Sequence, residues 1–299
     1  MTIPQRGAAA AVISYLWWGS MPLYWKALLA ISSFEILGHR VVWSALFTLA
    51  LIIFTGRWKK AVAFAAQNKQ KTLWLILGGC LITFNWGLYI WAVNTGRILE
   101  TSLGYYINPL VSMFFGMLFF RERLRRAQKI AIAVAAAGVC VQMMTLHEIP
   151  LVSLGLALSF GLYGVLKKAV SIEPPIALAI ETLSTAPAAI AFLCWLQHTG
   201  SAHLPYSLTI NLLLAGTGVM TSVPLLLFAY ATQRIKLTTI GFIQYLSPTM
   251  TFVIGTFIYG EPLFLGRAMT FACIWSALAI YSADTIFSAG KQRGLPENL

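Results

Sequence analysis

Three ionisable residues lie close together inside an otherwise apolar stretch of the sequence near position 40. Glu35 and His39 are four residues apart and would share one face of a helix, with Arg40 about 140° further round from Glu35. Because histidine changes its charge near neutral pH, the pair has the chemistry to take up and release a proton beside a polar cavity. The alternative is a cluster of charges at the membrane interface, with side chains that extend toward water.

A further carboxylate, Glu181, occupies the position in the second half of the chain that matches Glu35 at an offset of 146. A charge inside a membrane is costly, and such residues usually face a bundle interior or a cavity. Matching carboxylates in the two halves favour a shared role in substrate pairing or proton coupling. The alternative is a structural hydrogen bond to a neighbouring helix.

Aromatic rings and amides gather near two prolines, Pro109 and Pro248, which occupy matching places in the two halves of the sequence. A proline inside a helix removes a backbone hydrogen bond and kinks the helix, so that side chains near the kink are able to line a pocket for a small solute. The alternative is polar packing between helices, with aromatic rings at the membrane interface. The residues predicted to line a cavity are Tyr105, Tyr106 and Asn108 before Pro109, Gln244 and Tyr245 before Pro248, and Asn85, Trp86, Tyr89 and Asn94 in the span 72–94.

The motifs of common enzyme classes are absent from the sequence. It contains no GxxxxGK[ST] phosphate-binding loop, no HExxH zinc motif and no GxSxG nucleophile elbow. The four histidines and four cysteines have no metal-binding spacing. We therefore predict no catalytic residue, no metal and no cofactor, so that any pumping would depend on an ion gradient, on the gradient of the solute or on a partner.

The elements that must position these residues are long apolar stretches. Hydrophobic residues make up 59% of the 299 positions and charged residues only 10%, and about 20 apolar residues suffice to cross a bilayer as a helix. The net charge of +12 comes from basic residues that flank these stretches, and it does not indicate nucleic-acid binding. The sequence predicts an all-α polytopic membrane protein with ten transmembrane helices at 7–29, 35–55, 72–94, 100–120, 127–146, 150–168, 176–197, 208–232, 237–258 and 264–287.

The distribution of lysine and arginine predicts the orientation in the membrane, because short cytoplasmic loops are enriched in these residues. With the amino terminus in the cytoplasm, 17 basic residues lie on the cytoplasmic side, Lys167 and Lys168 among them, and 3 lie on the outer side. Both termini are therefore predicted to be cytoplasmic.

The second half of the sequence repeats features of the first at an offset of 139. Because each half holds five predicted spans, an odd number, the two halves would enter the membrane from opposite sides. We expect an inverted repeat of residues 1–146 and 147–299, an arrangement that many transporters use to alternate access to a central site. The matched pairs are Ala92 with Ala231, Tyr106 with Tyr245, Pro109 with Pro248, Gly116 with Gly255 and Glu122 with Glu261.

Several motifs together resemble those of a known family. They are EILGHRVVWS at 35–44, NWGLYIWAVN at 85–94, LETSLGYYINPLVSMFFGMLFFRERL at 99–124, LGLALSFGLYGVLKK at 154–168, IET at 180–182, GFIQYLSPTM at 241–250 and YGEP at 259–262. Over essentially its whole length the chain resembles the EamA group of drug/metabolite transporters, most closely its RarD-type members. The resemblance implies two inverted five-helix repeats around a central cavity, and movement of small metabolites or drugs across the bacterial inner membrane, usually outward.

We predict a secondary transporter that exports small metabolites or drugs by alternating access, with the proton as a candidate coupling ion. A passive facilitator or an uptake permease is the alternative within this class, and a membrane enzyme or an accessory subunit is a weaker one. The expected partners are the lipid bilayer and a small-molecule substrate, without nucleic acid. The sequence leaves open the substrate, the direction, the coupling ion and the choice between monomer and dimer.

Overall fold

The computed structural model describes residues 1–144, 150–200, 207–260 and 265–293, and every regular element in these residues is a helix. The elements are α1 (Ile3–Lys26), α2 (Ser33–Phe54), α3 (Trp58–Gln67), α4 (Lys69–Asn94), α5 (Ile98–Phe120), α6 (Arg126–Met143), α7 (Leu151–Val170), α8 (Pro174–His198), α9 (Leu208–Thr232), α10 (Leu237–Gln244), α11 (Leu246–Val253), a π-helical turn (Ile254–Ile258) and α12 (Leu265–Arg293).

Eight helical segments in the described part of the chain are long and apolar enough to cross a membrane. They lie in α2, α4, α5, α7, α8, α9, the α10–α11 segment with its π-helical turn, and α12. The helices α1 and α6, of 24 and 18 residues, pack beside these eight. The all-α, multi-pass class is thus confirmed, while the number of ten spans stays a prediction.

The two prolines affect their helices differently. The amide of Pro248 has no hydrogen to donate to the carbonyl of Gln244, four residues earlier, and α10 ends at Gln244 before α11 begins at Leu246. In contrast, α5 continues as one helix through Pro109. The interruption expected from a proline is therefore found at Pro248, and a kink at Pro109 stays a prediction.

One short helix lies in the gap between the predicted spans 35–55 and 72–94. The segment after α2 forms the ten-residue helix α3, which buries Ala61 and leaves Lys59 and Lys60 exposed. Ala61 packs against Ile52 of α2 and Ala179 of α8. The sequence analysis did not predict this helix, because the flanking charges hide a short amphipathic pattern whose apolar side rests on the bundle.

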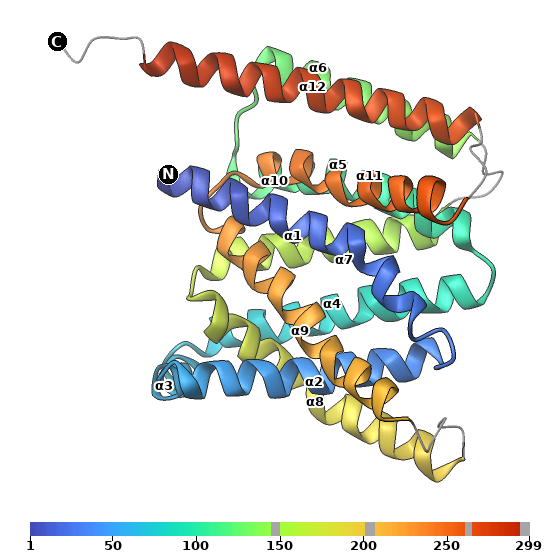
Figure 1. Ribbon diagram of the computed structural model, residues 1–299. Helices are drawn as coiled ribbons and strands as arrows, with labels where there is room; N and C mark the ends of the chain where they lie inside the picture. Colours follow the sequence, from blue (N-terminus) through green and yellow to red (C-terminus); the bar gives the residue numbers. More distant parts are fainter. Residues whose placement is uncertain (145–149, 201–206, 261–264, 294–299) are drawn as a thin grey trace.

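The helices pack in pairs that are exchanged when the two halves of the chain are exchanged. In Figure 1, α6 and α12 lie side by side at one edge of the bundle, and α2 and α8 lie at the opposite edge. Between these edges, contacts also correspond in pairs when the two halves are exchanged. The contact of α2 with α9 corresponds to that of α8 with α4, and the contact of α1 with α9 corresponds to that of α7 with α4. The contacts of α1 with α10 and α11 correspond to that of α7 with α5.

Two glycines 139 residues apart allow two of these equivalent crossings to be close. A β-carbon on Gly79 of α4 would lie 2.7 Å from the carbonyl oxygen of Glu181 in α8, and one on Gly218 of α9 would lie 2.5 Å from the carbonyl oxygen of Trp43 in α2. Both distances are shorter than van der Waals contact, so each crossing requires a residue without a side chain.

Candidate functional site

A small cavity lies where α2, α4, α8 and α9 meet, and each of these helices contributes to its wall. Its volume is about 20 Å³, which holds about one water molecule and no larger solute. Of the residues predicted from the sequence, Trp86 and Glu181 line it. The full lining is Val41 and Ser44 from α2, Gly79, Ile82, Thr83 and Trp86 from α4, Leu178, Glu181, Thr182 and Thr185 from α8, and Thr221 and Leu225 from α9.

Hydroxyl groups supply most of the polar atoms of this wall. The hydroxyls of Thr182 and Thr185 donate to backbone carbonyls in the preceding turn of α8, as threonines in membrane helices commonly do. Ser44 differs, since its buried Oγ has no hydrogen-bond partner among the described residues. The sequence analysis missed these hydroxyls because serine and threonine are common in transmembrane helices and carry no spacing motif.

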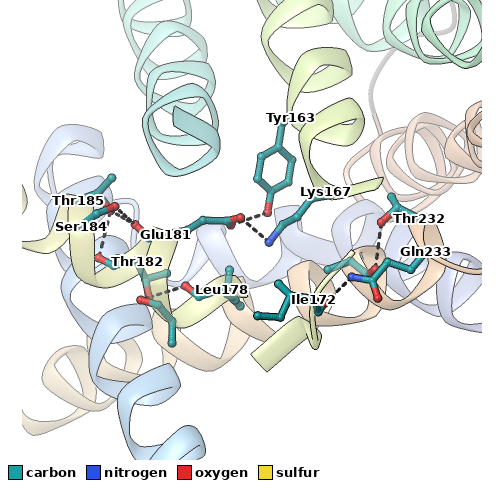
Figure 2. Close-up of polar contacts among 12 residues, drawn as sticks. Tyr163, Lys167, Ile172, Leu178, Glu181, Thr182, Ser184, Thr185, Thr232 and Gln233 are labelled. Atoms are coloured by element: carbon teal, nitrogen blue, oxygen red, sulfur yellow. Dashed lines mark hydrogen bonds and ion pairs between the residues drawn. The ribbon is translucent and has the colours of Figure 1, made fainter. Parts of the chain in front are cut away.

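A buried ion pair borders the cavity at Glu181. Lys167 Nζ of α7 lies 2.7 Å from Glu181 Oε1 of α8, with side chains 1% and 2% exposed, and Tyr163 Oη donates to Glu181 Oε2 at 3.1 Å. Figure 2 shows the lysine and the tyrosine converging on the carboxylate from successive turns of α7. The structural alternative considered for Glu181, a polar link to a neighbouring helix, is thus present at the cavity wall.

The sequence analysis counted Lys167 among the basic residues on the cytoplasmic side, at the end of the predicted span 150–168, and did not anticipate that its side chain is buried. Lys167 lies in the last turn of α7 and is directed into the bundle toward Glu181, whereas its neighbour Lys168 reaches Glu122 at 3.3 Å. Without Lys167 the predicted cytoplasmic count falls from 17 to 16 against 3. The available signal was the four-residue spacing of Tyr163 and Lys167, which puts both on one helical face.

Arg40 of α2 lies among aromatic rings on another side of the cavity. Its guanidinium carbon is 4.2 Å from the ring centre of Trp86 and 4.8 Å from that of Trp25, and its Nε donates to Thr221 Oγ1 at 3.2 Å. Tyr89 and Tyr105 interact with its charge, and their rings are 5.7 Å apart in an edge-to-face arrangement. We call Trp25, Trp86, Tyr89 and Tyr105 the aromatic cage of Arg40.

The structure does not bring the other predicted coupling residues, Glu35 and His39, to Glu181. Both lie in α2, Glu35 is buried, and the two interact electrostatically. The helices α2 and α8 run antiparallel, because Gly38 faces Leu193 while Thr48 meets Thr182 at 2.7 Å. Thirteen helical positions separate Glu35 from Thr48, which corresponds to about 20 Å. The matching carboxylates therefore belong to different ends of the helix pair.

The tyrosines and amides near the prolines join helices instead of lining the cavity. Tyr245 Oη donates to the carbonyl of Tyr106 at 3.4 Å, and the Ser112 hydroxyl donates to Gln244 Oε1 at 3.2 Å, so both contacts hold α10 against α5. Asn108 is also buried in this part of the bundle.

The amide of Asn85 has a comparable role between α4 and α7. It donates to the Leu156 carbonyl and to Ser159 Oγ, both at 2.8 Å. The side chain of Asn94 lies outside the described residues. Asn85, Gln244 and Tyr245 thus make the interhelical contacts that were considered as the alternative for this group. Of the predicted rings and amides whose side chains the structure describes, Trp86 alone lines the cavity.

Glu122 caps a helix from the other half of the chain. Its carboxylate accepts from the backbone N–H groups of Leu237 and Thr238 at 2.8 Å each, at the start of α10, and Lys168 lies 3.3 Å away. Burial raises the pKa of this carboxyl, but the two N–H groups and the charge of Lys168 lower the pKa further, so the net shift is downward. Glu261, the residue matched to Glu122 in the repeat, lies outside the described residues.

Known proteins are similar to this sequence over nearly its full length. A sequence profile of the EamA-like transporter family matches residues 5–144 and 149–283. The chain is 43% identical over 281 residues to an uncharacterized transporter of Vibrio cholerae, which covers 94% of this chain and 93% of that protein. It is 40% identical over 285 residues to the protein RarD of Escherichia coli, with 95% and 96% covered.

A solved crystal structure shows the same fold at a greater distance. It matches with a TM-score of 0.71 at 17% identity and covers 92% of this chain and 96% of the other. Together with the helices that are able to cross a membrane and the relatives named as transporters, these matches identify the molecule. The chain belongs to the EamA-like transporter family and is a multi-pass membrane transporter.

Proposed function

We propose that this protein is a secondary transporter that moves small metabolites or drugs outward across the bacterial inner membrane by alternating access. The observation that carries the proposal is the cavity, which is lined by α2 and α4 from the first half of the chain and by α8 and α9 from the second. A cavity shared by two halves opens to either side when the halves tilt against each other. In the present conformation it is too small for a solute, as expected of a closed intermediate.

The two halves are proposed to be inverted five-helix repeats, residues 1–146 and 147–299, with ten spans in all. Three observations support this: the family profile matches two successive segments, the helix pairs are exchanged when the halves are exchanged, and Gly79 and Gly218 make equivalent close crossings at an offset of 139. The boundary between the repeats falls within 145–149, outside the described residues.

Both termini are proposed to be cytoplasmic, because 16 basic residues on that side against 3 on the other still satisfy the positive-inside rule. The connection between α7 and α8 then faces the cytoplasm, and the connection between α1 and α2 faces outward. Lys167 and Glu181, near the first connection, belong to the cytoplasmic half of the bundle. Arg40, seven residues into α2, belongs to the outer half.

If transport is coupled to protons, Glu181 is the preferred coupling residue over Glu35 and His39. Its carboxylate borders the cavity and pairs with Lys167, so protonation would release a charged contact between α7 and α8. If transport needs no proton gradient, the same cavity would serve a passive facilitator. If the driving gradient is directed inward, the protein would be an uptake permease. Equal transport rates in vesicles with and without a pH gradient would rule out proton coupling.

The test is the extracellular solute profile by mass spectrometry. It compares cells that overproduce the wild type, Glu181→Gln or Glu173→Gln at equal membrane levels with cells that carry an empty vector. Glu173 is the matched control, because its half-buried carboxylate lies just before α8 and pairs with Arg57 at 2.8 Å, and it does not line the cavity. We expect a discrete set of compounds enriched with the wild type and with Glu173→Gln only. Identical profiles for wild type and empty vector would contradict export.

A further inference from the structure

We propose that Arg40 and its aromatic cage form the subsite for the anionic group of a flat, apolar organic anion. The inference rests on the proposed transport function and specifies the substrate class of the same cavity. Its basis is a guanidinium held in the membrane-spanning part of α2, whose terminal nitrogens donate no hydrogen bond to any residue that the structure describes.

The contacts of Arg40 involve the faces of the guanidinium and its Nε, and they leave the two terminal nitrogens available. Trp25 and Trp86 lie over it at 4.8 and 4.2 Å, and Nε donates to Thr221. In the part of the chain that the structure describes, the two terminal nitrogens donate to no residue. These nitrogens form the fork that pairs with carboxylate and sulfonate groups.

Lys167 and Lys168 each lie near a carboxylate, whereas Arg40 has no acidic partner among the described residues. Lys167 pairs with Glu181 at 2.7 Å, and Lys168 lies 3.3 Å from Glu122. Among the described residues the charged or ionisable side chains that act on Arg40 are Tyr89 and Tyr105, which are neutral donors at ordinary pH, and no carboxylate lies within 4.0 Å. A positive charge inside a membrane without a counter-ion is costly, so an arriving anion is favoured at this point.

The cavity and Arg40 have two neighbouring residues in common. Trp86 and Thr221 line the cavity and also contact Arg40, so a solute that widens the cavity reaches the guanidinium. The surrounding surface is provided by indole and phenol rings, which favour a flat apolar body. A neutral amide of the same shape would fill the space and leave the charge unpaired.

The probes are benzenesulfonate, a permanent anion, and benzenesulfonamide, its neutral counterpart. Binding of each to the purified full-length protein is measured by isothermal titration calorimetry at neutral pH. We expect the wild type to bind the sulfonate about tenfold or more tightly than the sulfonamide, as loss of a charged hydrogen-bond pair predicts. Arg40→Gln abolishes this preference, and Arg40→Lys, which keeps the charge without the fork, retains only part of it.

Arg97→Gln is the matched control, because Arg97 also lies over a tryptophan, Trp91 at 5.3 Å, but its side chain is 48% exposed and paired with Glu100. It should bind both probes as the wild type does. Equal affinity of the wild type for the two probes overturns the inference even if the Arg40 variants do not fold. An unchanged preference in folded Arg40→Gln overturns it as well.

Flux of benzenesulfonate into proteoliposomes separates this inference from the proposed function. Arg40-dependent binding without flux would support the anion subsite and contradict transport of this class of solute. Flux of both probes at equal rates, unchanged in Arg40→Gln, would support transport and overturn the anion subsite.

Discussion

At the scale of single residues, Lys167 and Glu181 are two buried charges that compensate each other inside the bundle. Each charge is nearly inaccessible, and each is compensated by the other at 2.7 Å. Removing one partner of a buried pair leaves an uncompensated charge, whereas removing both leaves an apolar contact. The pair as a whole therefore adds little to the stability of the fold, but each of the two residues depends on the other being present.

The prediction at this scale concerns Lys167→Met alone and combined with Glu181→Leu. The single substitution should lower the free energy of unfolding by about 3–5 kcal/mol, because the carboxylate of Glu181 stays buried without its cation. The double substitution should lose clearly less. Thermal or denaturant unfolding of the purified protein in detergent measures both, and a double variant less stable than the single one would contradict the assigned pairing.

Replacement of Glu35 tests which end of the α2–α8 helix pair holds the proton-coupling residue. Glu35 interacts with His39 about 20 Å from the Glu181 end of α2 and α8. If the cavity carboxylate alone couples protons, vesicles with Glu35→Gln keep gradient-driven transport while vesicles with Glu181→Gln lose it. Loss in Glu35→Gln at equal protein level would instead assign coupling to the Glu35–His39 pair.

At the scale of elements, glycine decides where two helices cross closely. A methyl group on Gly79 would lie 2.7 Å from a backbone oxygen of α8, which has no freedom to move aside. We expect Gly79→Ala to lower the free energy of unfolding by about 1–3 kcal/mol. Gly87 on the same helix α4 is the control, because its nearest neighbour would be 3.8 Å away. Gly87→Ala should be neutral or stabilising, and equal effects of the two substitutions would contradict the close crossing.

The cap of α10 by Glu122 predicts a pH dependence of stability. The pKa of Glu122 lies below its ordinary value of 4.5 in the folded protein, so the ionised carboxylate stabilises the folded state above that pH. This contribution is lost as the pH falls through the lower, folded pKa. Glu122→Gln should be less stable than the wild type at neutral pH and approach it in acid. A constant difference in melting temperature across this range would contradict the cap.

At the scale of the whole molecule, the two halves meet along α2 and α8 beside the cavity. Thr48 and Thr182 touch there at 2.7 Å between hydroxyl oxygens, so we expect cysteines at these positions to be near enough for a disulfide. In a background without the four native cysteines, Thr48→Cys with Thr182→Cys should lose transport on oxidation and regain it on reduction. The single variants are the controls, and full transport by the oxidised double variant would contradict rocking of the halves at this contact.

The sequence by itself determined the all-α membrane class and the family, and it marked Arg40, Trp86 and Glu181. These follow from local properties: apolar stretches long enough for a bilayer, charges that are costly inside one, and motifs that are contiguous in the chain. It also marked Tyr89 and Tyr105, which belong to the cage of Arg40. The same reasoning grouped Asn85, Gln244 and Tyr245 with the cavity, where the structure uses them to join helices.

Only the tertiary structure decided which polar groups meet. Lys167 and Glu181 stand on different helices. The spacing of Tyr163 and Lys167 shows that both share a helical face, but it does not show that this face is directed toward Glu181. The hydroxyl lining of the cavity and the separation of Glu35 from Glu181 likewise follow from the antiparallel contact of α2 with α8. Sequence spacing reports which residues share a helical face, whereas the choice of partner depends on how the faces of separate helices pack.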